Sequence, residues 1–240
     1  MNISSGLSEL RGNLNLRSRF NVWWPQYKQR KQIRRTYPLK SFSQFGEDIV
    51  LQHILPNQVG TYIDIGSGHP IVGSNTYLLY QRGWSGVLVD PIESNIAESR
   101  RTRVRDVCIQ AACGLESDEP VTFYEYDIYE YSTTSMDRVL ELKSLGHLVS
   151  NEYTVDSVNV NTLFPIVQAH SPLVLCIDVE GSEFNVLKQI DWDKFTPDYI
   201  VVEEWDPPLT KPTEISHFLS DRDYKIYGVA GMSSIYTRNY

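Results

Sequence analysis

Short, almost wholly apolar runs recur along this chain, and a carboxylate or a glycine-bearing turn follows most of them. These runs have the length of β-strands and cover residues 61–65, 86–90, 107–112, 173–177 and 199–202. Segments with helical spacing separate them, which is the pattern of a parallel sheet that helices cover on both faces. We therefore predict an α/β fold built on a Rossmann-like, doubly wound sheet.

The remaining segments complete this predicted fold. Two closing runs at 225–229 and 234–237 predict a hairpin, so the sheet should be mostly parallel with a closing antiparallel strand. An added strand is expected at 121–126, before a tyrosine-rich loop that suits either a pocket cover or ordinary strand packing. The predicted helices cover 43–55, 75–82, 91–103, 160–169, a segment ending near 188, and 213–220.

Charge divides the 240 residues into two parts, and we place the boundary at residues 38/39. Residues 1–40 hold nine Lys or Arg and one Glu, whereas 41–240 hold thirteen bases and twenty-nine acids. An acidic body repels phosphate polymers, so stable nucleic-acid binding is not expected. We expect the charged side chains of the basic arm 1–38 to be exposed to solvent. Peripheral contact of the arm with an anionic membrane is the alternative.

The sequence carries no membrane-length apolar run and no visible signal peptide, so we expect a cytoplasmic protein, with the membrane surface as the alternative location. Three cysteines without metal spacing are expected to be reduced thiols. The oligomeric state stays open.

Functional residues should lie beyond the carboxyl ends of the parallel strands, where ligands bind in open α/β sheets. Carboxylates crowd these positions, which favours a cationic ligand over a pyrophosphate. Asp178, Glu180 and Glu203 are the candidate catalytic bases, with His69 as a secondary acid or base. A divalent metal, Mg²⁺ or Mn²⁺, is the alternative partner of these carboxylates, although no metal motif fixes it.

The turn after the first strand predicts a nucleoside-containing ligand. Gly66 and Gly68 allow close approach of a ligand, but Ile71 stands where a dinucleotide fingerprint needs glycine, which opposes NAD(P) binding. Asp90 ends the second strand at a spacing typical of a carboxylate that binds ribose hydroxyls. Its structural alternative is a helix cap before the next helix.

Four ordered blocks resemble the FkbM family of S-adenosylmethionine-dependent methyltransferases. They are SQFGEDIVL (43–51), YIDIGSGHP (62–70), SNTYLLYQRGWSGVLVDP (74–91) and CIDVEGSEFNVL (176–187). The sequence differs from many relatives in having Ser67 and Gly68 instead of Ala-Asn. The resemblance implies a methyltransferase fold and O-methylation of sugar or natural-product hydroxyls. The cofactor-binding residues it and the strand ends imply are Gln44, Glu47, Asp48, Asp64, Gly66, Ser67, Gly68, Asn75, Thr76, Asp90 and Ala111.

We expect an S-adenosylmethionine-dependent O-methyltransferase whose acceptor is a sugar hydroxyl of a glycan or glycan precursor. The alternatives are an RNA or natural-product methyltransferase, an NAD(P) oxidoreductase, and a non-catalytic module that binds a nucleoside or a glycan. The acceptor sugar and the methylated hydroxyl stay open.

Overall fold

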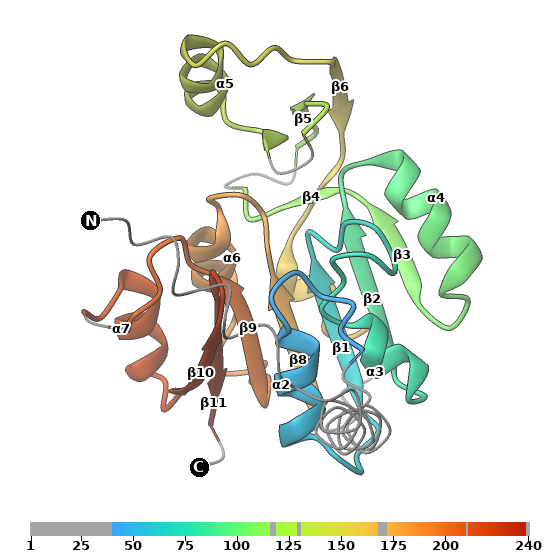
Figure 1. Cartoon of the computed structure of the whole chain (residues 1–240), viewed down its shortest axis with the longest axis vertical. Coiled ribbons are helices and arrows are strands. Elements are labelled where there is room, and N and C mark those ends of the chain that lie inside the picture. The colour runs from blue at the N-terminus through green and yellow to red at the C-terminus, as the bar shows by residue number, and fades with distance from the viewer. Residues whose placement is uncertain (1–39, 116–118, 129–130, 168–171, 210, 239–240) are drawn as a thin grey trace, which may run out of the picture. The chain divides into compact units, whose positions relative to one another are not determined.

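A seven-stranded sheet forms the centre of the domain (Figure 1). The computed structural model describes residues 40–115, 119–128, 131–167, 172–209 and 211–238. The strand order is β10-β11-β9-β8-β1-β2-β3. The strands are β1 (Thr61–Ile65), β2 (Ser85–Asp90), β3 (Val107–Gln110), β8 (Leu173–Ile177), β9 (Tyr199–Glu203), β10 (Lys225–Ala230) and β11 (Ser233–Thr237).

Strand directions confirm the predicted α/β fold. The five strands from β9 to β3 are parallel to their neighbours, and β11 enters antiparallel between β9 and β10. This places the ends of β1, β2, β8 and β9 along one edge of the sheet. Residues that follow these strands can therefore meet at one site.

Helices cover both faces of the sheet, which explains why β1, β8 and β9 are apolar without alternation. On one face Ile63 and Ile177 pack with residues of α6 (Glu183–Gln189) and α7 (Glu214–Ser220). On the other, Tyr62 and Val174 pack with α2 (Glu47–Ile54) and α3 (Tyr77–Gln81). Each buried aliphatic side chain stabilises the fold by about 1.5–3 kcal/mol. The helix α4 (Glu93–Thr102) packs against β2 and β3.

An insertion between β3 and β8 stands beyond the carboxyl ends of the sheet strands (Figure 1). It contains β5 (Val121–Glu125) paired with β6 (Asn151–Val155), α5 (Met136–Ser144), and β4 (Ala112–Cys113) paired with β7 (Ser157–Val158). The sequence prediction missed α5, β6 and β7. It also ran β3 and β4 together as one strand.

The predicted helix at 160–169 is wrong over its described part. There the chain forms only a 3-10 turn, η3 (Val160–Thr162), followed by turns up to Val167. Pro165 has no backbone N–H and disfavours helical geometry in the residue before it, so a helix cannot run through it without a break. The predicted helix at 43–55 likewise starts later, at Glu47, because Gly46 takes a left-handed conformation with φ 92°.

The three cysteines are free thiols, as predicted, although Cys108 is only half-buried. Among the described residues no helix is long and apolar enough to cross a membrane. The predicted arm 1–38 lies outside the described residues.

Candidate active site

A cavity lies beyond the ends of β1, β2 and β8, at the edge of the sheet where ligands bind in open α/β folds. Of the predicted site residues, Gly66, Asp90, Ala111, Asp178 and Glu180 line it. The insertion completes the wall with Phe123 and residues 132–134. Sequence reasoning missed these wall residues because no local motif marks them. We call this space the inner cavity.

Gly66 brings the turn after β1 against the end of β8. Its φ is 75°, and a Cβ on it would stand 1.6 Å from the carbonyl oxygen of Asp178. Any side chain here would push the two strand ends apart. The glycine therefore sets the distance between the turn and Asp178.

Asp90 fixes the same turn from the β2 side. The carboxylate is 1% exposed and accepts the Gly68 N–H at 2.8 Å through one oxygen. The other oxygen accepts the Ile92 N–H at 2.9 Å and Asn95 Nδ2 at 3.1 Å. Asp90 thus holds the start of the following helical segment while it lines the inner cavity, and its contact with a ribose stays a prediction.

Asp64 lies beneath the turn and lines neither of the two pockets described here. Its carboxylate accepts the Thr76 hydroxyl at 2.5 Å. Burial raises the pKa of Asp64 to about 6, against the opposing effects of the Thr76 hydrogen bond and the positive charge of Arg103. Arg103 donates to Thr76 Oγ1 at 2.9 Å and to Ser74 Oγ at 3.2 Å. Thr76 thus links Asp64 to Arg103, and its role in shaping the site stays a prediction.

A fully buried ion pair holds the Arg103 guanidinium that donates to Thr76 and Ser74. Arg103 Nε contacts Asp106 at 2.8 Å, and both side chains are 0% exposed. Asp106 also accepts the Tyr62 hydroxyl and the Gly86 N–H. The guanidinium lies 5.2 Å and 5.3 Å from the ring centroids of Tyr62 and Tyr80. In the sequence this arginine is hidden within a charge-rich run that resembles a solvated helix end.

Glu47 and Asp48 hold the loop that precedes α2. Glu47 accepts Ser233 Oγ at 2.9 Å, and each carboxylate is at most 1% exposed. The donors to Asp48 are Ser41 Oγ at 2.7 Å, the Phe42 N–H at 2.7 Å and Ser43 Oγ at 2.9 Å. Neither acid lines a pocket described here, so their implied cofactor contact stays a prediction. Gln44 lines a second, outer pocket.

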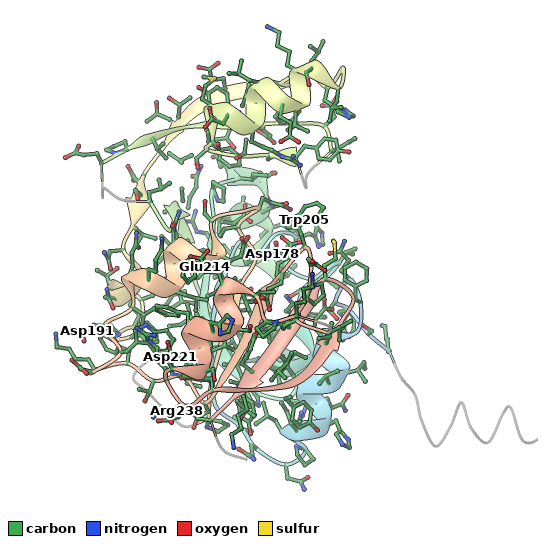
Figure 2. The ribbon with its side chains drawn as sticks, turned by 90° about the vertical axis from the view of Figure 1, so that its left-hand side faces the viewer. Asp178, Asp191, Trp205, Glu214, Asp221 and Arg238 are labelled. Atoms are coloured by element: carbon green, nitrogen blue, oxygen red, sulfur yellow. The ribbon has the colours of Figure 1, made fainter. Side chains whose placement is uncertain are left out.

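A wider outer pocket adjoins the inner cavity and shares Gly66, Asp178 and Glu180 with it. Residues from the α2 loop, the β1 turn and the β9 end surround it. Its other lining residues are Ser41, Phe42, Ser43, Gln44, Ser67, Gly68, His69, Val72, Gly73, Asn95, Glu203, Trp205 and Met232. Trp205 is 60% exposed at this pocket, and Figure 2 shows it toward the same end of the sheet as Asp178. No sequence motif marks Trp205.

Two predicted residues of the β1 turn differ in how their polar atoms are used. His69 accepts the Ile71 and Val72 N–H groups through Nδ1, at 3.2 and 3.1 Å, so one ring nitrogen closes the turn. Ser67 Oγ is buried and has no hydrogen-bond partner among the described residues. A buried polar atom of this kind suits a ligand contact. Asn75 is half-buried and lines neither pocket.

Three carboxylates meet where the two pockets join, because oxygens of Asp178, Glu183 and Glu203 lie within 4.8 Å of one another. Glu183 accepts the Val179 and Gly181 N–H groups, which makes it a fixed part of the turn after β8. Glu203 Oε2 is buried and has no partner among the described residues. Asp178 and Glu203 hydrogen-bond to each other.

Burial and mutual repulsion make the Asp178–Glu203 pair hold a proton near neutrality. Burial, followed by the charges of Glu203 and Glu183, raises the pKa of Asp178 well above its usual range. Burial, followed by the charges of Glu180 and Glu183, raises the pKa of Glu203 to about 7. Two carboxyls this close cannot both ionise easily, so they share one proton. Such a pair can take up a proton from a bound hydroxyl.

Glu180 stands between the two pockets in a strained conformation. Its φ is 53°, a left-handed value that costs a non-glycine residue about 1 kcal/mol or more. Gly181 follows with φ 101°, so the chain turns sharply and Glu180 lines both pockets. Strain of this kind is typical of functional sites.

Of the tyrosine-rich segment, Tyr124 and Tyr126 pack with Leu142 beneath α5 and line neither pocket. Packing is therefore their role in the described structure. Tyr129 lies outside the described residues.

Several solved methyltransferase structures are similar to this chain. A structure of the human methyltransferase 10 domain containing protein shares 9% identity with a TM-score of 0.41, covering 95% of this chain and 100% of that one. The hMettl16 catalytic domain in complex with MAT2A 3′UTR hairpin 6 shares 14% identity with a TM-score of 0.38, covering 87% and 78%. A Pyrococcus abyssi tRNA (uracil-54, C5)-methyltransferase in complex with S-adenosyl-L-homocysteine shares 13% identity with a TM-score of 0.36, covering 82% and 39%.

Sequence comparison identifies the family. No curated protein matches the chain significantly. The profile of the methyltransferase FkbM domain, however, matches residues 58–226, which include β1 to β9 and all the strand ends that form the site. The chain therefore belongs to the FkbM methyltransferase family and is a methyltransferase.

Proposed function

We propose that this protein is an S-adenosylmethionine-dependent O-methyltransferase that acts on a sugar hydroxyl of a glycan or glycan precursor. The observation that carries the proposal is the Asp178–Glu203 pair, placed where the inner cavity meets the outer pocket. The inner cavity, at the ends of β1 and β2, suits the cofactor, and the wider outer pocket suits an acceptor. The pair between them is a proton acceptor.

The inner cavity fits the cofactor in its place in the fold and in the chemistry of its lining. Asp90 would bind the ribose hydroxyls, and Ala111 with Phe123 would contact the adenine. Ser67 lines the outer pocket, and its free Oγ is available to the end of the methionine part that reaches the junction of the two pockets. When bound, S-adenosylmethionine supplies an electrophilic methyl group on a positively charged sulfur. Asp178 and Glu180 provide negative charge near that position, which favours a cation.

The residues of the site have two tasks in methyl transfer. The outer pocket holds the acceptor hydroxyl in line with the methyl group, and such positioning can account for most of the acceleration. The Asp178–Glu203 pair takes the hydroxyl proton as the oxygen attacks. Proton removal matters because an alcohol is a poor nucleophile.

Asp178→Asn tests the base. We expect a loss of roughly 10²-fold or more in turnover, with little change in S-adenosylhomocysteine affinity. Asp221→Asn is the matched control, because that aspartate is exposed and lies away from Asp178 in Figure 2. Full activity of the Asp178 variant would refute the assignment.

Ligand and acceptor assays separate the rival functions. Calorimetry with S-adenosylhomocysteine and with NAD distinguishes a methyltransferase cofactor from an oxidoreductase cofactor. Labelled-methyl transfer to a panel of methyl glycosides, RNA and polyhydroxylated natural products then identifies the acceptor class. Cofactor binding without transfer to any acceptor would favour a non-catalytic binding module.

A divalent metal remains the second proposal for the carboxylates. Asp178, Glu183 and Glu203 have the donor type that Mg²⁺ or Mn²⁺ prefers, although Glu183 already accepts two backbone N–H groups. Loss of activity in EDTA, restored by Mg²⁺ or Mn²⁺, would assign the pair to metal binding in place of proton transfer.

A further inference from the structure

The outer pocket combines negative charge with an exposed aromatic ring. Its described lining includes Asp178, Glu180 and Glu203 but no Lys or Arg. Even with a proton held between Asp178 and Glu203, the three acids leave this wall negatively charged. An anionic group bound here would meet repulsion that no Lys or Arg of the described lining offsets.

Trp205 is the only lining residue of the described pocket with a large, mostly exposed aromatic surface. Its position is fixed through its neighbour Glu204, which is 6% exposed. The Glu204 N–H donates to the Met232 carbonyl at 2.7 Å, and its carboxylate accepts the Tyr236 hydroxyl at 2.8 Å and the Thr213 hydroxyl. The chain next to the indole is thus held firmly, while the ring itself stays open to a ligand.

We propose that the outer pocket selects an uncharged pyranose, which stacks its apolar face on Trp205, and that its carboxylates exclude sugars bearing a carboxylate or phosphate inside the pocket. This inference rests on the proposed function and specifies its acceptor. An aromatic ring offers apolar area and little conformational freedom to lose, so it suits the C–H face of a sugar. Sugar hydroxyls at the ring edge can donate to Glu180 and to the pair.

Matched acceptor pairs test the charge selection. The methyl glycosides of glucose, galactose and mannose are each compared with the corresponding methyl uronoside, which differs only by a carboxylate at C6. For pairs in which transfer occurs, kcat/KM should favour the neutral member by roughly tenfold or more at low salt, and the ratio should narrow as salt screens the charges. Glu180→Gln should also narrow the ratio of kcat/KM between the neutral and the charged acceptor. Equal or better transfer to the uronosides would overturn the inference.

Trp205→Ala tests the stacking surface. We expect KM for the neutral acceptor to rise about tenfold to a hundredfold, as for the loss of a large apolar contact, with a smaller change in kcat. Trp205→Phe should recover most of the affinity. Calorimetry should give wild-type affinity for S-adenosylhomocysteine, because Trp205 does not line the inner cavity. Leu209→Ala is the matched control, since Leu209 is 72% exposed in the same loop and lines neither the cavity nor the outer pocket.

A binding assay separates failure of this inference from failure of the proposed function. If no glycoside is methylated, the proposed function fails. Tryptophan fluorescence is then recorded for the wild type and for Trp205→Phe as the same methyl glycosides and uronosides are added. The difference between the two proteins reports occupancy of the outer pocket. A response to the neutral members alone supports the selection. A response to the uronosides, or none to any glycoside, refutes it.

Discussion

Replacing Arg103 with methionine should destabilise the domain far more than the same change two residues earlier. Arg103 and Asp106 form a buried pair at positions i and i+3, with both side chains 0% exposed. Removing the guanidinium leaves Asp106 buried with only two neutral donors, Tyr62 and Gly86. Breaking a buried pair from one side costs about 3–5 kcal/mol. For a domain of this size, that lowers the melting temperature by about 6–20 °C.

The chain contains its own control for this experiment. Arg101 pairs with Glu98 at the same sequence separation, but the side chains are 74% and 38% exposed. Arg101→Met should therefore change stability by less than about 1 kcal/mol. The loss of stability in Arg103→Lys should fall between these two values, because lysine keeps the positive charge but lacks the planar guanidinium group. Urea unfolding followed by circular dichroism at pH 7 gives the free energies, and a loss below about 1 kcal/mol for Arg103→Met would refute the reasoning.

Three further predictions concern ligand binding and catalysis. Asp90→Ala should weaken the binding of S-adenosylhomocysteine by roughly 1.5–3 kcal/mol in calorimetry. It should also lower the free energy of unfolding, because Asp90 accepts the Gly68 and Ile92 N–H groups. Unchanged affinity would remove Asp90 from the site. Turnover should rise with pH through about 7, because the Asp178–Glu203 pair must lose protons before it can accept one; a flat pH–rate profile from 5 to 9 would contradict this base. Deleting residues 1–38 should abolish binding to anionic vesicles at low salt yet leave cofactor affinity intact, and loss of cofactor binding would show that the predicted boundary is wrong.

The sheet was predictable because strands buried on both faces leave an unbroken apolar signature, as at 173–177. The carboxylates at strand ends were predictable for the same reason, since a charged residue after such a run must occupy a strand end. The insertion was not, because α5 is mostly exposed and buries few residues, of which only Leu142 is fully enclosed. Trp205 and the Arg103 network depend on contacts between distant segments, which local sequence patterns do not report.

The two pockets share only three of their described lining residues, Gly66, Asp178 and Glu180. The inner wall otherwise comes from the ends of β1 and β2, the turn after β8 and the insertion. The outer wall comes mainly from the loop before α2, the β1 turn and the end of β9, with single residues from α4 and the β10–β11 turn. Substitutions at outer positions such as Trp205 or Met232 can thus alter acceptor choice without touching the inner wall. Such a division lets single substitutions change acceptor preference, whereas a side chain at Gly66 would collide with the Asp178 carbonyl and disturb both pockets at once.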